Sequence, residues 1–202
     1  MSGYGHKLQE QLRALVGRAE DRARRLPERA RYALDVVRGY YYLRGTQRSG
    51  RVYVHGSVRV DPRGTIVVGQ RSMFLDGVVR TELIAHPHAE IQIGCDCGFA
   101  YGLSVEARSS VRIGNRCMTG AMVRICDFAM QHVAPVVIED DVWLAHGVII
   151  EPGVRIGRRS VVSTGSVVTK DIPPEHMALG NPARAMPLQG FWRDRSSVDE
   201  GD

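Results

Sequence analysis

The stretch LAHGVIIEPGVR, residues 144–155, contains two aliphatic residues six positions apart, Leu144 and Ile150. This spacing continues on both sides of the stretch. An aliphatic residue recurs at every sixth position of residues 138–168: Ile138, Leu144, Ile150, Ile156, Val162 and Val168. A small or β-branched residue follows each of the first five by four positions: Val142, Val148, Val154, Ser160 and Ser166. Because the two series keep step, chance is a poor explanation and the stretch belongs to a repeat.

The same six-residue unit is visible upstream, although less regularly. It appears in two runs of three units, and the residue four positions after each unit's first residue is again small or apolar. The first run is Ile93, Phe99 and Val105, followed by Cys97, Leu103 and Ser109. The second run is Ile113, Thr119 and Ile125, followed by Cys117, Val123 and Ala129. A period of six fits neither a helix nor a hairpin, but it fits a short strand and a turn repeated on successive flat faces. The pattern predicts a mainly β protein, a parallel β-solenoid.

The composition agrees with this fold class. The 202 residues include 22 glycines, 44% are hydrophobic and 6% are aromatic, which suits small aliphatic side chains and many tight turns. No apolar run approaches the length of a membrane span, and charged residues occupy the place of a signal peptide. We therefore expect a cytoplasmic protein. Its four cysteines are too few and too unevenly spaced for a disulfide framework or a zinc site.

The first 50 residues differ from the rest, because they hold 11 Lys and Arg against 5 Asp and Glu. The segment HKLQEQLRALVGRAEDRARR predicts an amphipathic helix, and Pro27 suits the first turn of a second helix that closes near Gly45. We divide the chain into a helical segment at 1–50, the solenoid at 51–187 and a tail at 188–202. The helices pack on the solenoid or on another subunit, and weak peripheral membrane contact is the alternative. The basic residues lack interleaved stacking or groove-reading motifs, so we expect no nucleic acid.

The repeat slips at two places, which indicate outward loops on a rigid scaffold. Between Ile125 and Ile138 the interval is 13 residues, and the disturbed piece is DFAMQHVAP, residues 127–135. A second slip separates Val105 from Ile113 by eight residues and contains Glu106 and Arg108. Loops on such scaffolds are common places for reactive groups.

Residues 135–184 carry IEDDVW, EPGVRIG, STGSVVTKDIPP and a closing GNPAR in that order. This combination resembles the hexapeptide-repeat acyltransferases, in the sugar O-acetyltransferase branch that includes maltose, galactoside and polysaccharide acetyltransferases. The resemblance covers roughly residues 51–187. It implies a left-handed parallel β-helix, a homotrimer, and acetyl-coenzyme A as the acyl donor without a metal ion.

The resemblance also implies a catalytic histidine in the loop before the VW unit. His132 is the only histidine in that loop, and an imidazole near its ordinary pKa suits the removal of a hydroxyl proton. Asp127 is the expected partner that orients the ring. The loop departs from the Asp-x-Asp-x-His pattern of polysaccharide-type relatives, because His132 stands one place late. Either the loop rearranges to present His132 or the site has decayed.

Coenzyme A is expected along outer turns of the solenoid, between subunits. The positions that match the family are His146, Thr164, Thr169, Lys170 and Arg184. Lys170 is one of only two lysines in the chain, and with Arg184 it can bind the phosphates of the cofactor. The acceptor contacts are less defined, since the asparagine of galactoside-type relatives is absent. We name Trp143, Tyr101, Glu106 and Arg108 as substrate candidates.

The sequence therefore predicts an acetyl-coenzyme A dependent transferase that acetylates a hydroxyl of a sugar or sugar-bearing small molecule. The transfer is direct, in a ternary complex, with His132 as general base. A non-catalytic hexapeptide-repeat scaffold is the alternative. A metalloenzyme of the γ-carbonic anhydrase type is a weaker one, because three zinc-binding histidines are not evident.

Overall fold

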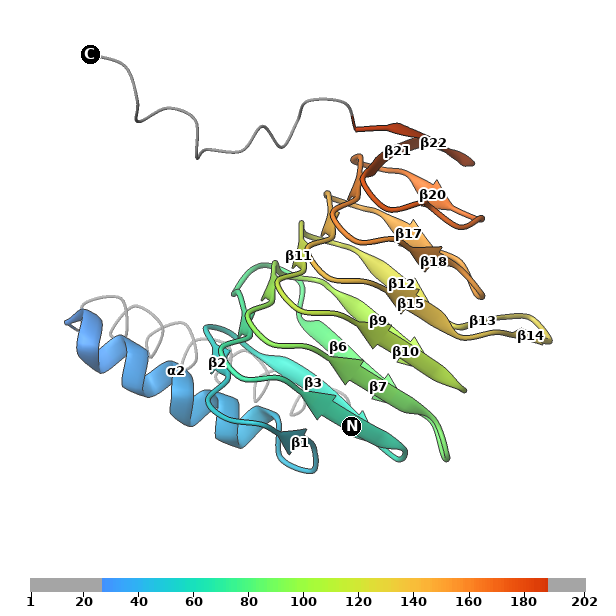
Figure 1. Ribbon diagram of the computed structural model, residues 1–202. Coiled ribbons are helices and arrows are strands. Elements are labelled where there is room, and N and C mark those ends of the chain that lie inside the picture. Colours follow the sequence, from blue (N-terminus) through green and yellow to red (C-terminus); the bar gives the residue numbers. More distant parts are fainter. Residues whose placement is uncertain (1–26, 189–202) are drawn as a thin grey trace, which may run out of the picture.

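The computed structural model describes residues 27–188. One helix, α2 (Glu28–Tyr42), precedes a solenoid of short strands (Figure 1). The predicted second helix is present, but Pro27 stands at its N-cap and not in its first turn, and the chain turns through Gly45 before the first strand. The predicted helix at residues 7–26 and most of the predicted tail lie outside the described residues.

The solenoid has three faces, each formed by one sheet whose neighbouring strands come from successive coils. We call them sheets A, B and C, in the order in which each coil visits them. Sheet A contains β1 (Gln47–Arg48), β4 (Thr65–Val68), β7 (Glu90–Ile93), β10 (Ser110–Ile113), β15 (Val136–Ile138) and β18 (Arg155–Ile156). Sheet B contains β2 (Tyr53–Val54), β5 (Met73–Phe74), β8 (Gly98–Phe99), β11 (Met118–Thr119), β16 (Trp143–Leu144), β19 (Val161–Val162), β21 (His176–Gly180) and β22 (Ala183–Pro187). Sheet C contains β3 (Val58–Pro62), β6 (Thr81–Ala85), β9 (Ser104–Ala107), β12 (Arg124–Cys126), β17 (Ile149–Ile150) and β20 (Val167–Val168).

The pairing within the three sheets is parallel, except for the final β21–β22 hairpin. The predicted parallel β-solenoid is therefore confirmed. Each two-residue strand places one side chain inward and one outward, because successive residues of a strand point to opposite faces. This alternation is why a six-residue unit with a single aliphatic residue suffices for one strand and one turn.

Residues of the six-residue repeat stack on one another across the coils. In sheet A, Ile93 pairs with Ile113, Ile113 with Ile138, and Ile138 with Ile156. Equivalent columns run through sheets B and C, and all of these positions are buried. The second series is buried too, with two exceptions among the predicted positions. Ala129 is exposed and Ser109 is half-buried, because both fall where the chain leaves the regular coil.

Helix α2 closes the N-terminal end of the solenoid by packing on β2 and β3. Its approach is close, since a Cβ atom added at Gly39 would lie 2.2 Å from the carbonyl oxygen of Val52. Leu43, at its C-cap, is fully buried. The helix thus covers the first coil, whose strands would otherwise form an open edge.

Charged residues alternate along the edge where the chain passes from sheet A to sheet B. Six successive turns place a non-glycine residue at this edge with φ of 54–61°: Arg71, Asp96, Arg116, Asp141, Arg159 and Glu175. This left-handed conformation costs a non-glycine residue about 1 kcal/mol. Bidentate hydrogen bonds join Arg71 to Asp96 at 2.5 and 2.6 Å and Arg116 to Asp141 at 2.6 and 2.8 Å. These bonds hold the pKa of the Asp96 and Asp141 carboxyl groups below the usual range.

The double variant Asp96→Asn with Asp141→Asn tests this charge ladder. A carboxylate whose pKa is depressed on folding stabilises the protein above its unfolded pKa and loses that effect as the pH falls, here from about pH 4 downward. We expect the double variant to lose stability at neutral pH and to show a shallower further loss on acidification. Thermal unfolding between neutral and acidic pH measures both. An unchanged acid slope would contradict the assignment.

Thr119 is a polar residue in the buried column of sheet B, between Phe99 and Leu144. Its hydroxyl oxygen is buried and has no hydrogen-bond partner among the described residues. Thr119→Val keeps the shape and removes that oxygen, so the free energy of unfolding should rise by about 1 kcal/mol. The reverse change in the same column, Val162→Thr, should lower it. Denaturant unfolding of both variants checks the pair, and a destabilised Thr119→Val would refute the argument.

Candidate functional site

Most of the predicted site residues fall on two edges of the solenoid, while Trp143 and Arg184 lie on strands β16 and β22 of sheet B. The B–C edge, where the chain passes from sheet B to sheet C, carries Tyr101, His146 and Thr164. The C–A edge carries Glu106, Arg108, the 127–135 insertion, Thr169 and Lys170. In a three-sided solenoid the C–A edge lies opposite sheet B. One chain therefore divides the predicted residues between two separate regions.

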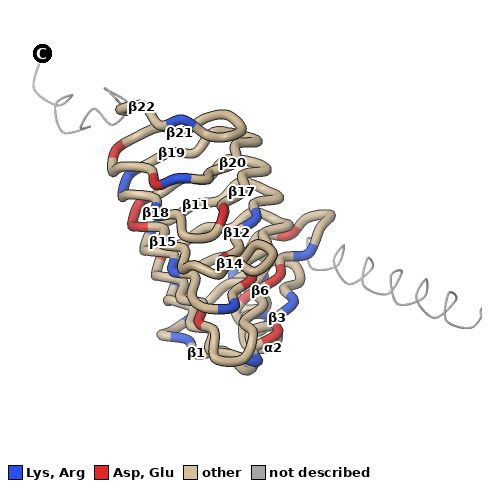
Figure 2. The backbone as a smooth tube through the Cα atoms, turned by 90° about the vertical axis from the view of Figure 1, so that its right-hand side faces the viewer, with Lys and Arg blue, Asp and Glu red and all other residues tan. Residues whose placement is uncertain are grey.

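The insertion at residues 127–135 forms a hairpin that projects from the C–A edge (Figures 1 and 2). Its strands are β13 (Phe128–Ala129) and β14 (His132–Val133), which pair antiparallel. His132 is exposed and pairs with Ala129, and its ring makes no hydrogen bond within residues 27–188. The imidazole is thus free to meet a molecule that approaches the hairpin.

Asp127 lies at the base of the hairpin and is completely buried. Its carboxylate accepts hydrogen bonds of 2.7 Å from three consecutive backbone N–H groups, those of Arg108, Ser109 and Ser110. Its backbone oxygen accepts from the Ala134 N–H at 2.9 Å. Asp127 therefore ties both repeat slips together, and the ring of His132 is not among its partners in this structure.

Glu106 and Arg108 lie beside the hairpin and contact groups that the sequence did not link to them. Glu106 Oε1 is 2.8 Å from Nε2 of His86, a partly buried histidine of the preceding coil. The Arg108 guanidinium lies 3.8 Å from the centre of the Phe128 ring, and His86 meets the same ring edge-on. These contacts fix the first strand of the hairpin on the C–A edge.

A cavity of about 280 Å³, which we call the hairpin cavity, lies between the hairpin and the outer face of sheet C. The lining residues are Arg124, Cys126, Phe128, Ala129, Met130, Ile149, Ile150 and Glu151. The Cys126 thiol donates to the Phe128 carbonyl oxygen at 3.1 Å, and burial raises its pKa. Cys126 is therefore protonated and hydrogen-bonded at neutral pH, and the polar contacts available to a ligand come from Arg124 and Glu151.

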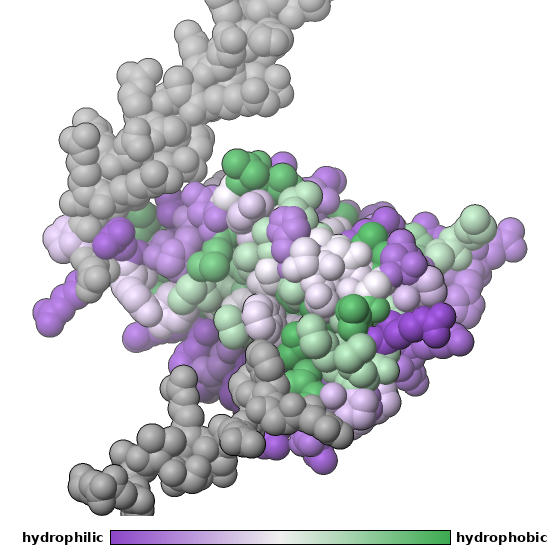
Figure 3. Space-filling view, turned by 90° about the horizontal axis from the view of Figure 1, so that it is seen from above, coloured by the Kyte–Doolittle hydropathy of each residue, from purple (hydrophilic) through white to green (hydrophobic). Residues whose placement is uncertain are grey.

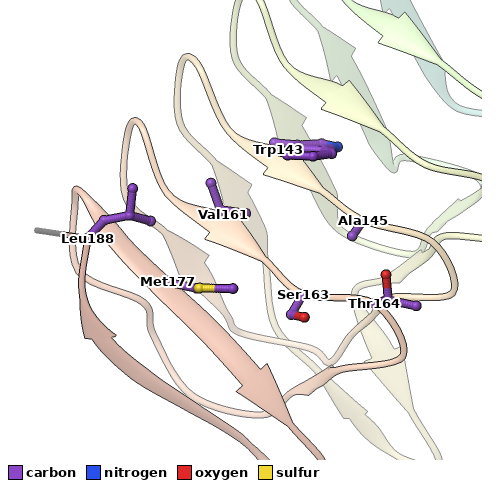
Figure 4. Close-up of a pocket in the computed structure, with 7 residues that line it drawn as sticks. All are labelled: Trp143, Ala145, Val161, Ser163, Thr164, Met177 and Leu188. Atoms are coloured by element: carbon purple, nitrogen blue, oxygen red, sulfur yellow. The ribbon is translucent and has the colours of Figure 1, made fainter. Parts of the chain in front are cut away.

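A second depression, which we call the apolar pocket, lies on the outer face of sheet B near the B–C edge (Figure 4). Its volume is about 250 Å³, and it is lined by Trp143, Ala145, Val161, Ser163, Thr164, Met177 and Leu188. His146 is exposed on the adjoining turn, and its carbonyl oxygen accepts the Gly165 N–H at 2.8 Å. The sequence identified Trp143 and Thr164 but missed the other five residues, Ala145, Val161, Ser163, Met177 and Leu188. Outward positions of sheet B strands were the available signal.

The remaining predicted residues lie apart from the apolar pocket. Tyr101 is on the B–C edge two coils before His146, covered by the backbone at Gly77, where an added Cβ would lie 2.1 Å from its ring. Thr169 and Lys170 are exposed at the C–A edge, and Arg184 is exposed on β22. Neither Lys170 nor Arg184 forms an ion pair with another described residue. Both cations are therefore available to an anionic ligand.

Hydrophobic side chains extend beyond the pocket, and in the view from above they form separate groups among polar ones (Figure 3). The outward column of sheet B runs through Gly98, Met118, Trp143, Val161 and Met177 in register. Met118 and Trp143 are 59% and 45% exposed. This column is a face with few polar groups for water to solvate.

Two further features concern metals and membranes. Among residues 27–188, no three His, Cys, Asp or Glu side chains are grouped so that they could hold a metal ion. No helix of this described part is long and apolar enough to span a bilayer.

Comparison with known proteins adds to this geometry. Residues 135–170 match the family described as bacterial transferase hexapeptide (six repeats). This part of the chain thus consists of hexapeptide repeats. The chain is 42% identical to the galactoside O-acetyltransferase of Lactococcus lactis over 94 residues, which are 41% of this chain and 45% of that protein. The chain thus matches less than half the length of such curated relatives.

Solved structures support the fold. An N-acyltransferase from Bacillus cereus, in complex with dTDP and coenzyme A, superposes with a TM-score of 0.62 at 14% identity, covering 79% of this chain and 89% of that one. A polySia-specific acetyltransferase superposes with a TM-score of 0.53 at 23% identity, covering 76% and 74%. At these identities the likeness concerns the solenoid alone.

The variant Asp127→Asn tests the structural role of the buried carboxylate. An amide has one acceptor oxygen for three N–H donors, and its own N–H groups would face them, so we expect a loss of about 2–4 kcal/mol in the free energy of unfolding. Asp171→Asn is the matched control, because the exposed Asp171 carboxylate accepts a single backbone N–H, from Arg155 at 2.7 Å. Equal losses for the two variants would show that Asp127 has no special role in holding the hairpin.

Proposed function

We propose that the chain is an acetyl-coenzyme A dependent transferase that moves an acetyl group to a hydroxyl of a sugar or sugar-bearing molecule. The proposal rests on one observation, namely that the residues similar to the transferase family also form most of the apolar pocket. The residues that match the transferase family, 135–170, include five of the seven residues that line the apolar pocket: Trp143, Ala145, Val161, Ser163 and Thr164.

The apolar pocket fits the pantetheine arm and thioester of the donor. The arm is an uncharged chain, and the pocket offers it the faces of Trp143, Val161 and Met177 with the hydroxyls of Ser163 and Thr164 beside them. The exposed Arg184 lies on sheet B and suits the phosphates, and Lys170, on the C–A edge, can reach them from a neighbouring protomer. The backbone at His146 suits the amide groups of the arm. Thr169 adjoins Lys170 and adds a hydroxyl.

The hairpin cavity fits the acceptor. Phe128 offers a ring face to the C–H groups of a sugar, while Arg124 and Glu151 offer hydrogen bonds to its hydroxyls. Ala129 lines this cavity and is paired with His132, which supports a role for the imidazole toward a hydroxyl bound there. Glu106 and Arg108 adjoin the hairpin from the C–A edge, and Tyr101 and Trp143 remain candidates for outer contacts.

The chemistry requires one proton transfer and one acyl transfer. His132 accepts the hydroxyl proton as the acceptor oxygen bonds to the thioester carbon, which becomes tetrahedral and carries an oxyanion. The carbon–sulfur bond then breaks, the coenzyme A thiolate leaves, and the imidazolium returns the proton to sulfur. No covalent enzyme intermediate is needed, since both substrates are bound at once.

Two copies of the chain are required for this reaction, because His132 projects from the edge opposite the face that holds the apolar pocket. We infer that the hairpin of one protomer meets sheet B of its neighbour. The exposed column of Met118 and Trp143 is suited to burial in such a contact. A cyclic trimer repeats this heterologous contact three times and closes, which agrees with the expected homotrimer.

The proposal is tested by binding and turnover together. Calorimetry with acetyl-coenzyme A should show saturable binding that weakens about tenfold in Lys170→Ala, as expected for one charge-assisted contact. Thioester consumption over a panel of sugars should fall by about 10²–10⁴ in His132→Ala while binding persists. Mixing equal amounts of His132→Ala and Thr164→Arg chains should restore roughly a quarter of the activity. In a randomly reassembled ring, about a quarter of the shared sites combine an intact His132 from one variant with an intact pocket from the other.

Each outcome separates the alternatives. Absence of saturable coenzyme A binding would support the non-catalytic scaffold. Turnover that survives His132→Ala would retain the transferase and remove His132 as the base. Failure of mixed chains to regain activity, with each variant folded, would contradict a site shared between protomers.

A further inference from the structure

Helix α2 presents an exposed apolar and aromatic stripe along its outer side. Ala33 is exposed, and Val37, Tyr40 and Tyr41 are 61%, 55% and 60% exposed. Successive positions are three or four residues apart, and Tyr40 and Tyr41 are neighbours, so the four side chains share one side of the helix. Its opposite side packs on the first coil of the solenoid. Helix α2 lies at the N-terminal end of the solenoid (Figure 1), so the stripe is on the side of the helix away from the first coil.

Arginines surround the stripe. Residues 28–51 include six arginines and two acidic residues, Glu28 at the start of the helix and Asp35. Asp35 is 7% exposed and lies 3.6 Å from Arg38, so it contributes little negative charge to the surface. The Arg44 guanidinium lies 4.8 Å from the centre of the Tyr41 ring, and that of Arg48 lies 4.5 Å from the Tyr40 ring.

The adjoining elements do not neutralise this charge. Strand β2 has no acidic residue, and the acidic residue of β3, Asp61, is paired with Arg63 at 3.1 Å. The outer side of α2 therefore combines exposed tyrosines with an excess of arginine. We call it the Tyr–Arg face, formed by Arg29, Ala33, Val37, Tyr40, Tyr41, Arg44 and Arg48.

We propose that the Tyr–Arg face docks on an anionic lipid surface. Tyrosine rings are favoured at the boundary between lipid and water, where the ring is buried and the hydroxyl stays hydrated. Arginines beside them bind lipid phosphates in bidentate fashion, and their aliphatic stems can lie along the apolar surface. A helix with this arrangement lies in the plane of the membrane interface rather than across it.

Charge complementarity and the central position of Val37 favour lipid over the other occupants. A nucleic acid would leave Val37 and Ala33 against phosphates without compensation. A second copy of this face would bring like charges together around the tyrosines. The inference concerns the N-terminal end of the molecule and is independent of the proposed transferase activity.

Flotation of the full chain with vesicles tests the proposal. One set of vesicles contains phosphatidylcholine alone, and the other contains phosphatidylcholine mixed with phosphatidylserine. We expect the protein to float with the second set and to be released by raised salt, because exposed charges are screened. Arg29→Glu with Arg44→Glu should lower the partition coefficient by about tenfold or more. Tyr40→Ser with Tyr41→Ser should lower it at unchanged net charge.

The matched control is Arg112→Glu with Arg158→Glu, which makes the same charge change at exposed positions on the solenoid. It should retain at least half of the binding. Equal loss in this control, or no preference for anionic vesicles, would overturn the proposal. It would also be overturned if the α2 variants changed the molar mass in solution without affecting flotation, since the face would then be a contact between copies. Retention on single-stranded RNA that the same variants abolish, without vesicle binding, would assign the face to nucleic acid.

Discussion

The structure depends on the stacking of equivalent side chains from one coil to the next. A coil of three two-residue strands buries about one side chain per strand and cannot form a core alone. Ile138 becomes buried because Ile113 and Ile156 lie directly below and above it in the same column. Hydrogen bonds between the parallel strands hold this register, so each column fixes the next coil. The two ends need covers, which α2 and the β21–β22 hairpin supply.

The same constraint determines where reactive groups can stand. A regular coil has no room for an inserted residue inside, so the extra residues of 127–135 leave the solenoid as a hairpin. A protruding hairpin would lose its position without an anchor. Asp127 provides the anchor by accepting hydrogen bonds from three consecutive backbone N–H groups, at residues 108–110 of the neighbouring coil. The burial of that carboxylate makes the anchor strong, because a hydrogen bond to a charged group gains strength where water is excluded. The hairpin can then hold His132 and the wall of a cavity at a fixed place.

The three-sided shape also explains why a single chain holds only parts of the candidate site. Residues six apart lie on different faces, and residues 18 apart, such as Ile138 and Ile156, lie on the same face of neighbouring coils. The apolar pocket gathers Trp143, Val161 and Met177 because they share the outer side of sheet B. His132 lies on the opposite edge, and no bending of so rigid a stack could bring the two together. Association of like chains is the means by which such a scaffold can assemble a site.

The sequence by itself determined the fold class and the positions of the coils. The six-residue spacing identified the buried residues from Ile93 to Val168, and its slips located the hairpin, because periodicity is a local property that each unit repeats. It erred at Ala129, where the chain had already left the coil, and it assigned no contact to His86. The tertiary structure alone decided that His86 pairs with Glu106, that Asp127 faces backbone N–H groups, and that Met177 and Leu188 complete a pocket. These contacts join residues whose separations differ from the repeat, so no local pattern encodes them, and only the stacked coils bring the groups within bonding distance.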